Sequence, residues 1–199
     1  MAGANTGDFA ARYLHLGHTR GLLPLGLIFL AIVRAETRAS RATEAYYWLA
    51  IIVLRTGATN LADLATHDLR LGYPLTLAAL TVLIAAVLLF VFWRDGSAAP
   101  AAADGRKLPA TDSAYWLAML TGGTLGTAGG DFVADELGLG VGYGSLFLFA
   151  TFLIVLFAAT RIGKMGLFWY WAAIVAARTA GTTMAISCRA AAVSISAYR

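Results

Sequence analysis

The sequence is poor in charge and almost devoid of cysteine. Charged residues make up 13% of its 199 residues, whereas soluble domains carry about 25%. Cys188 is the single cysteine, which excludes an intramolecular disulfide and a thiolate metal cluster within one chain. Residues 1–12 lack the basic start and the apolar stretch of a cleavable signal peptide. A disulfide-stabilised secreted domain is therefore excluded, and an ordinary soluble domain fits the composition poorly.

The hydrophobic residues that are present indicate a membrane protein. They make up 59% of the chain, which is more apolar surface than a chain of this length could bury in one soluble core. The net charge of +4 does not indicate a nucleic-acid partner, because the basic residues lie in short connections between apolar runs, where they act as topology signals. We therefore predict an all-α polytopic transmembrane bundle whose partner is the lipid bilayer, with no nucleic acid.

Apolar runs define the expected membrane spans, since roughly 20 residues are needed to cross ~30 Å of hydrocarbon. The runs lie at residues 20–34, 45–66, 73–93, 112–134, 141–160 and 166–187. Residues 1–16 are interpreted as the last half of a further helix, so about seven transmembrane helices are expected. Tryptophans near the span ends predict an aromatic belt at the membrane interface. These are Trp48, Trp93, Trp116, Trp169 and Trp171.

Basic residues in the connections predict the orientation. They gather in alternate connections, which the positive-inside rule places in the cytoplasm. This set is Arg34, Arg38, Arg41, Arg94, Arg106, Lys107, Arg161 and Lys164. The stretch 95–111, rich in Ala, Pro, Gly and Ser, is predicted to be a flexible cytoplasmic linker. It divides the chain into a first membrane half, residues 1–94, and a second membrane half, residues 112–199.

An internal repeat connects the two halves. In each half a Tyr-Trp pair is followed, at the same spacings, by an acid and then by a glycine. The matched residues are Tyr47-Trp48, Asp63 and Gly72, then Tyr115-Trp116, Asp131 and Gly140. Parts of the same pattern recur as Asp8 and Gly17, and as Tyr170-Trp171, Arg178 and Gly181-Thr182. We expect four parallel two-helix repeats, related by an axis along the membrane normal, with a partial first repeat and a degenerate fourth.

These elements, together with the Leu-Gly-Leu-Gly-x-Gly-Tyr run that ends at Tyr143, resemble bacterial membrane proteins built from four copies of the domain-of-unknown-function repeat 347. The resemblance covers nearly the whole chain. It implies a fold and a compartment, the bacterial inner membrane crossed several times, but no activity. The chain departs from the family pattern where Ile186 stands at the position of the last acid, and its first helix is expected to be incomplete.

A polar face runs along the first helix of each repeat. Arg55, Thr59 and Asp63 are four residues apart and therefore share one helix face. The matching positions are Gly123, Thr127 and Asp131, and then Arg178, Thr182 and Ile186. A charge near the bilayer centre costs at least ~2.5–3.5 kcal/mol, so we expect both arginines to face the bundle interior and to pair with acids. The candidate acids are Asp8, Asp63 and Asp131.

The polar positions predict a transport path. The residues assigned to it are Arg55, Thr59, Asp63, Thr127, Asp131, Arg178, Thr182 and Asp8. The acids outnumber the arginines and leave a negative charge, which suits an inorganic cation or a proton. We therefore expect a small transporter or channel for an inorganic cation or a proton-coupled solute. The alternative is a non-transporting scaffold or accessory protein whose buried charges fix the register of the repeats.

Known catalytic motifs give no support for an enzyme. The sequence contains no G-x-x-x-x-G-K, H-E-x-x-H or G-x-S-x-G motif, so no catalytic residue, cofactor or metal is predicted. Glycines crowd residues 122–130, where we favour close helix packing over an unwound segment that exposes carbonyl groups to an ion. The sequence leaves open whether the protein forms a homo-oligomer.

Overall fold

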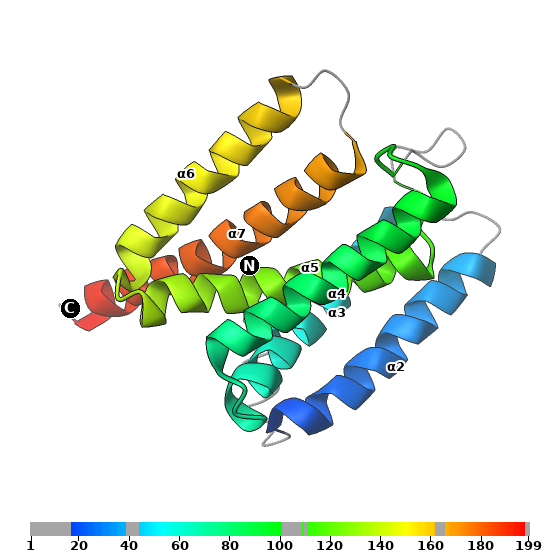
Figure 1. The fold of residues 1–199 in the computed structure, drawn as a ribbon. Coiled ribbons are helices and arrows are strands. Elements are labelled where there is room, and N and C mark those ends of the chain that lie inside the picture. The colour runs from blue at the N-terminus through cyan, green and yellow to red at the C-terminus, as the bar shows by residue number, and fades with distance from the viewer. Residues whose placement is uncertain (1–16, 39–43, 101–108, 110, 162–165, 198–199) are drawn as a thin grey trace.

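The computed structural model describes residues 17–38, 44–100, 109, 111–161 and 166–197, and these residues form a bundle of six α-helices without a β-strand (Figure 1). The helices are α2 Gly17–Arg38, α3 Glu44–Asp63, α4 Gly72–Asp95, α5 Ser113–Asp131, α6 Gly140–Arg161 and α7 Leu167–Ala197. The all-α prediction is confirmed, and each predicted span corresponds to one helix. The described helices are one fewer than the seven expected, because the further helix is predicted for residues 1–16, which lie outside the described ranges.

Helix length and composition agree with a membrane protein. Among the described residues, the stretches Glu44–Asp68, Gly72–Asp95 and Gly142–Arg161 are long and apolar enough to cross a membrane. The last helix, α7, continues to Ala197 instead of ending near residue 187. Residues 182–199 contain neither glycine nor proline, and their alanines are strong helix formers, so the local sequence has no stop signal.

A π-helical turn follows each of the two repeated acids, and the sequence patterns did not predict it. Turn η1, Leu64–Asp68, continues α3, and turn η2, Phe132–Glu136, continues α5 at the matching position. Such turns are uncommon and often mark functional segments. The repeat is therefore preserved in an unusual backbone feature as well as in its residues.

The chain then reverses through residues in the left-handed region. Arg70 has a φ of 54° and Gly72 a φ of 70°, and their counterparts Gly138 and Gly140 have φ values of 63° and 66°. Residues with a Cβ atom are disfavoured in this conformation. This explains why a glycine recurs at the start of α4 and of α6.

Replacing Arg70 with glycine should raise stability, because the exposed Arg70 holds a conformation that Gly138 adopts without a Cβ clash. The expected gain is about 1 kcal/mol, reduced by the greater freedom that glycine gives the unfolded chain. Thermal unfolding of the detergent-purified protein measures it, and Gly138→Arg, the reverse exchange, should lower the unfolding temperature. A lower unfolding temperature for Arg70→Gly would contradict this account of the turn.

Helices pair across repeat boundaries rather than within repeats. α2 packs on α3, α4 on α5 and α6 on α7, while α3, α5 and α7 form a continuous row. Figure 1 shows α2 and α6 at opposite edges of the bundle. Within their own repeats, α4 and α6 mainly contact the preceding π turns. The two predicted membrane halves therefore share an interface, because α3 and α4 both pack against α5.

The three first helices, α3, α5 and α7, run in the same direction, as parallel repeats require. Their first turns meet through the hydroxyl groups of Tyr47, Tyr115 and Tyr170. Farther along, Gly126 of α5 faces Arg178 of α7, and Gly130 faces Thr182 one turn later. The matching faces of successive repeats are thus turned toward one another inside the bundle.

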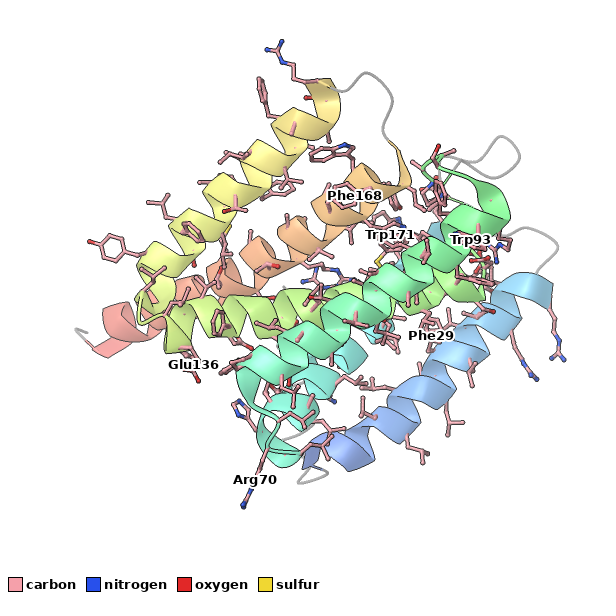
Figure 2. All side chains as sticks on the ribbon, viewed as in Figure 1. Phe29, Arg70, Trp93, Glu136, Phe168 and Trp171 are labelled. Atoms are coloured by element: carbon pink, nitrogen blue, oxygen red, sulfur yellow. The ribbon has the colours of Figure 1, made fainter. Side chains whose placement is uncertain are left out.

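Two of the motif tryptophans are buried in the core of the bundle. Trp116 and Trp171 are 7% and 2% exposed, whereas Trp48 and Trp93 are 55% and 81% exposed. Figure 2 labels Trp171 in the interior and Trp93 on the outside of α4. Trp116 and Trp171 lie near helix ends as predicted, but neighbouring helices cover the first turns of α5 and α7, so these two side chains do not face outward as a belt requires.

Candidate functional site

α5 and α7 approach each other closely because glycines on α5 face α7. A Cβ atom at Gly126 would lie 2.6 Å from the Cβ atom of Arg178, and one at Gly130 would lie 3.3 Å from the carbonyl oxygen of Thr179. α5 is helical throughout this stretch. The prediction of close packing in residues 122–130 is confirmed, and the alternative of an unwound segment there is wrong.

Arg55, Gly123 and Arg178 occupy matching positions in three repeats, and the structure brings them together. A Cβ atom at Gly123 would lie 3.2 Å from the Cβ atom of Ala58 on α3 and 3.6 Å from the guanidinium carbon of Arg178 on α7. The Arg178 guanidinium group therefore packs against α5 at Gly123. The positive charge of Arg55 is close enough to act on Arg178. Both arginines are partly buried, about three turns from the start of their helices.

The repeated acids lie away from the two arginines. Asp63 and Asp131 end α3 and α5, and both act electrostatically on Tyr73 at the start of α4. At 1.5 Å per residue, Asp63 is about 12 Å from Arg55 along the axis of α3. Although acids gather at this end, the described residues contain no group of three or more His, Cys, Asp or Glu side chains that could hold a metal ion.

The expected pairing of arginines with acids is not found in the described part of the chain. No ion pair there joins Arg55 or Arg178 to a carboxylate, and the salt bridges described belong to Arg94. Asp63 and Asp131 interact with other groups, and Asp8 lies outside the described residues. The helix geometry is the physical reason, because it places the arginines and the repeated acids at different depths.

Threonine hydroxyl groups along this face are bonded to their own helices. Thr59, Thr127 and Thr182 donate to the carbonyl oxygens of Arg55, Gly123 and Arg178, at 3.3, 3.1 and 3.1 Å. Thr56, Thr124 and Thr179 form a second matched set, at 3.1, 3.0 and 2.9 Å from the carbonyl oxygens four residues before them. This bond satisfies a buried hydroxyl within a helix. The hydroxyl protons of the predicted path are therefore already used, and the match extends to α7.

A chain of tyrosine hydroxyl groups lies at the same interior and was missed by the sequence interpretation. The hydroxyl oxygen of Tyr115 lies 2.8 Å from that of Tyr47 and 3.4 Å from that of Tyr170. Tyr47 and Tyr115 also lie near Arg178. These are the tyrosines of three Tyr-Trp pairs, so their identical place in each repeat was the signal that could have revealed the cluster.

Asn60 is a second buried polar residue that the sequence interpretation missed. It is 1% exposed, and neither polar atom of its amide has a hydrogen-bond partner in the described part of the chain. A Cβ atom at Gly21 of α2 would lie 3.2 Å from its amide nitrogen. Its counterpart on α5 is Ala128, so the repeat gave no signal for this position.

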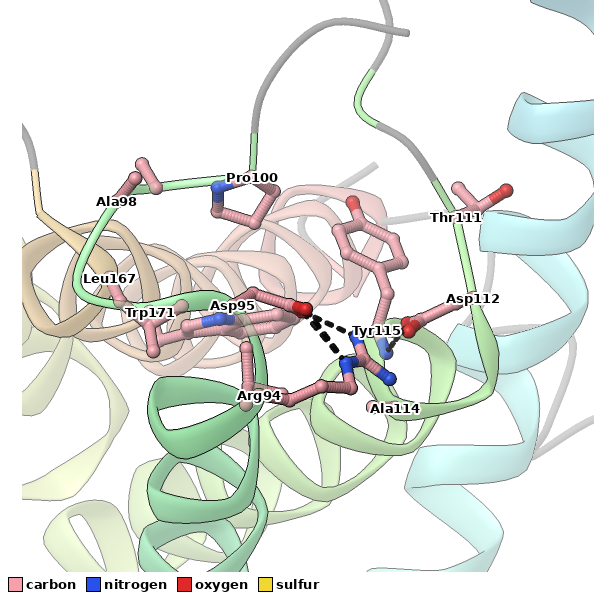
Figure 3. Close-up of a pocket in the computed structure, with 12 residues that line it drawn as sticks. Arg94, Asp95, Ala98, Pro100, Thr111, Asp112, Ala114, Tyr115, Leu167 and Trp171 are labelled. Carbon is pink, nitrogen blue, oxygen red and sulfur yellow. Dashed lines mark hydrogen bonds and ion pairs between the residues drawn. The ribbon is translucent and has the colours of Figure 1, made fainter.

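A cavity of about 330 Å³ opens where α4 ends and where α5 and α7 begin (Figure 3). Tyr115, Trp171 and Arg94 are among the residues that line it. Arg94 forms salt bridges with both Asp95 and Asp112. Asp112 also caps α5, because its side chain accepts a hydrogen bond of 2.7 Å from the backbone nitrogen of Tyr115. Through Tyr115, the cavity adjoins the chain of tyrosine hydroxyl groups and, beyond it, Arg178.

The apolar spans and this interior define a class: a helical membrane protein of parallel repeats whose matched polar positions gather inside the bundle. The chain belongs to the family described as Repeat of Unknown Function (DUF347), whose model matches residues 46–97 and 114–164, just over half of the chain. The matched stretches contain α3 with α4 and α5 with α6, which are the two complete repeats predicted. The partial first repeat and the degenerate fourth repeat lie outside the matched residues and stay predictions. No curated protein and no solved structure matches the chain.

Proposed function

We propose that the protein is a small multi-pass transporter or channel for an inorganic ion. The observation that supports this most is the arginine pair, Arg55 and Arg178, inside the bundle without a carboxylate partner in the described part of the chain. Charge within a membrane span is costly and is retained where it faces a cavity or a substrate path. Matched polar residues from three helices converge at this level, which is the arrangement that a central path requires.

The acids of the predicted path have a separate role in this proposal. Asp63 and Asp131 lie at the far end of α3 and α5 around Tyr73, where they would exchange protons at the mouth of the path. The charge count that favours a cation combines these acids with the arginines. Since the two groups lie at different depths, that count does not describe a single binding site.

The scaffold alternative keeps specific support of its own. The threonine hydroxyl groups are satisfied within their helices, and α5 packs tightly against α7 through Gly126. Both features also serve a bundle that transports nothing. An assay of ion flux distinguishes the two functions.

Purified protein in sealed vesicles should carry an inorganic ion faster than empty vesicles do. In this proposal, the double replacement Asp63→Asn with Asp131→Asn slows that flux by at least about tenfold, the effect of ~1.4 kcal/mol on a barrier. Ion-selective electrodes and a pH dye measure the flux, and helical content and monodispersity confirm folding. The exposed Glu44→Gln, at the start of α3, serves as a control. If the folded wild-type protein carries none of K⁺, Na⁺, H⁺, Cl⁻ and NO₃⁻, the transport function is contradicted and the scaffold function is supported.

The proposal places the protein in the bacterial inner membrane and gives it no enzymatic activity. The resemblance to bacterial membrane proteins favours the inner membrane, with the linker 95–111 in the cytoplasm. Among the described residues, the proposed path contains arginine guanidinium and threonine hydroxyl groups but no nucleophile paired with a base, which is the arrangement that covalent catalysis requires. The protein is accordingly proposed to act without a cofactor.

A further inference from the structure

The arginine pair determines the sign of the charge that the interior binds best. Arg178 lies over Gly123 of α5, with its guanidinium carbon 3.6 Å from where a Cβ atom would stand. Arg55 on α3 adds a second positive charge that acts on it. Two like charges repel each other, and a low-dielectric interior strengthens that repulsion. An anion between them is attracted to both groups and offsets part of their repulsion.

The hydrogen-bond donors at this level also favour an anion. A guanidinium group has five N–H donors and no acceptor, and no carboxylate of the described chain pairs with either group. The neighbouring threonines, Thr127 and Thr182, have given their protons to backbone carbonyl oxygens. The arginine N–H groups are therefore the donors best placed to bind a ligand here.

The available space limits the size of the anion. A Cβ atom at Gly123 would already lie 3.2 Å from Ala58, so α3, α5 and α7 leave little room between them. A carboxylate with a carbon chain needs more space than a single ion. From these observations, and resting on the proposed transport function, we propose that Arg55 and Arg178 together bind a small monovalent inorganic anion of about the size of chloride.

In this proposal, the anion reaches the site through the 330 Å³ cavity. Tyr115 lines the cavity, and its hydroxyl group continues through Tyr47 and Tyr170 toward Arg178. Tyrosine hydroxyl groups can turn to donate a hydrogen bond to a passing anion.

Chloride binding to the full-length protein in lipid nanodiscs tests the site directly. Broadening of the ³⁵Cl NMR line should be saturable for the wild-type protein. Arg178→Gln and Arg55→Gln should each weaken chloride binding at least about tenfold, since a hydrogen bond to a charged group contributes that much to affinity. Arg161→Gln is the matched control, because Arg161 is exposed at the end of α6 and lies over the ring of Phe157; its chloride affinity should equal that of the wild type.

The outcomes separate this site from the transport function. Chloride binding that the arginine variants lose, in a protein that shows no flux, supports the anion site and overturns transport. Cation flux with no saturable chloride binding overturns the anion site and leaves transport standing. Equal chloride binding by the wild type and by a folded Arg55→Gln variant also overturns the site. If Arg178→Gln does not fold, Arg178→Lys keeps the charge and should still bind chloride, more weakly than the wild type.

Discussion

Replacing Trp171 with alanine is expected to lower the free energy of unfolding by about 3–5 kcal/mol, the usual effect of truncating a buried aromatic side chain. Trp171 is 2% exposed, and its ring centroid lies 5.5 Å from that of Tyr115. The change leaves a void at the first turns of α5 and α7, next to the tyrosine hydroxyl groups. Thermal and denaturant unfolding in a mild detergent measure the loss.

Trp48→Ala is the matched control, because Trp48 holds the same position in an earlier repeat. It is 55% exposed, so its removal exchanges contact with lipid or detergent for little internal packing. Its effect should stay below about 1 kcal/mol, within the range of exposed substitutions. Similar losses for Trp48→Ala and Trp171→Ala would contradict the helix arrangement described for α3 and α7.

Gly126→Ala is expected to lower the free energy of unfolding by about 1–3 kcal/mol, as overpacking of a close interface does. The new Cβ atom would lie 2.6 Å from the Cβ atom of Arg178 and 3.1 Å from the backbone nitrogen of Thr179. A backbone atom cannot turn aside as a flexible side chain can, so α7 must move away from α5. Thermal unfolding measures the loss, and chloride binding should weaken as well because the displacement moves Arg178.

Gly181→Ala provides the control for this prediction. Gly181 is the counterpart of Gly126 in the last repeat, and a Cβ atom there would meet nothing within 4 Å. Alanine favours a helix over glycine by about 1 kcal/mol, so the variant should be as stable as the wild type or slightly more stable. Equal destabilisation by both alanines would mean that close contact between α5 and α7 does not limit stability.

Features encoded by local sequence were predicted well. The six spans follow from apolar runs, and the repeated glycines Gly72 and Gly140 do mark turns, because their φ values of 70° and 66° suit glycine. The crowded glycines at 122–130 also indicated close packing correctly. In each case the physical cause lies within a few residues of the pattern that revealed it.

Features that depend on which helices pair were not predictable in the same way. Trp48 and Trp116 begin the same motif, yet one is exposed and the other is buried, because α5 lies inside the row and α3 is less covered there. The pairing of Arg55 and Arg178 with acids was expected from charge balance along the chain. The fold instead groups residues by repeat position, which places the two arginines together and the two repeated acids together.

The pairing of α4 with α5 and of α6 with α7 has a consequence for how the chain enters the membrane during synthesis. In the spans Gly72–Asp95 and Gly142–Arg161, only 17% and 22% of the most apolar window is buried by protein, so these helices can leave the translocon for lipid unaided. α5 and α7 carry glycines, threonines and Arg178, and neither is among the three stretches apolar enough to cross a membrane by composition. Each strongly apolar helix is therefore made just before the weakly apolar helix that packs on it. The order of synthesis therefore supplies α5 and α7 each with an already inserted partner.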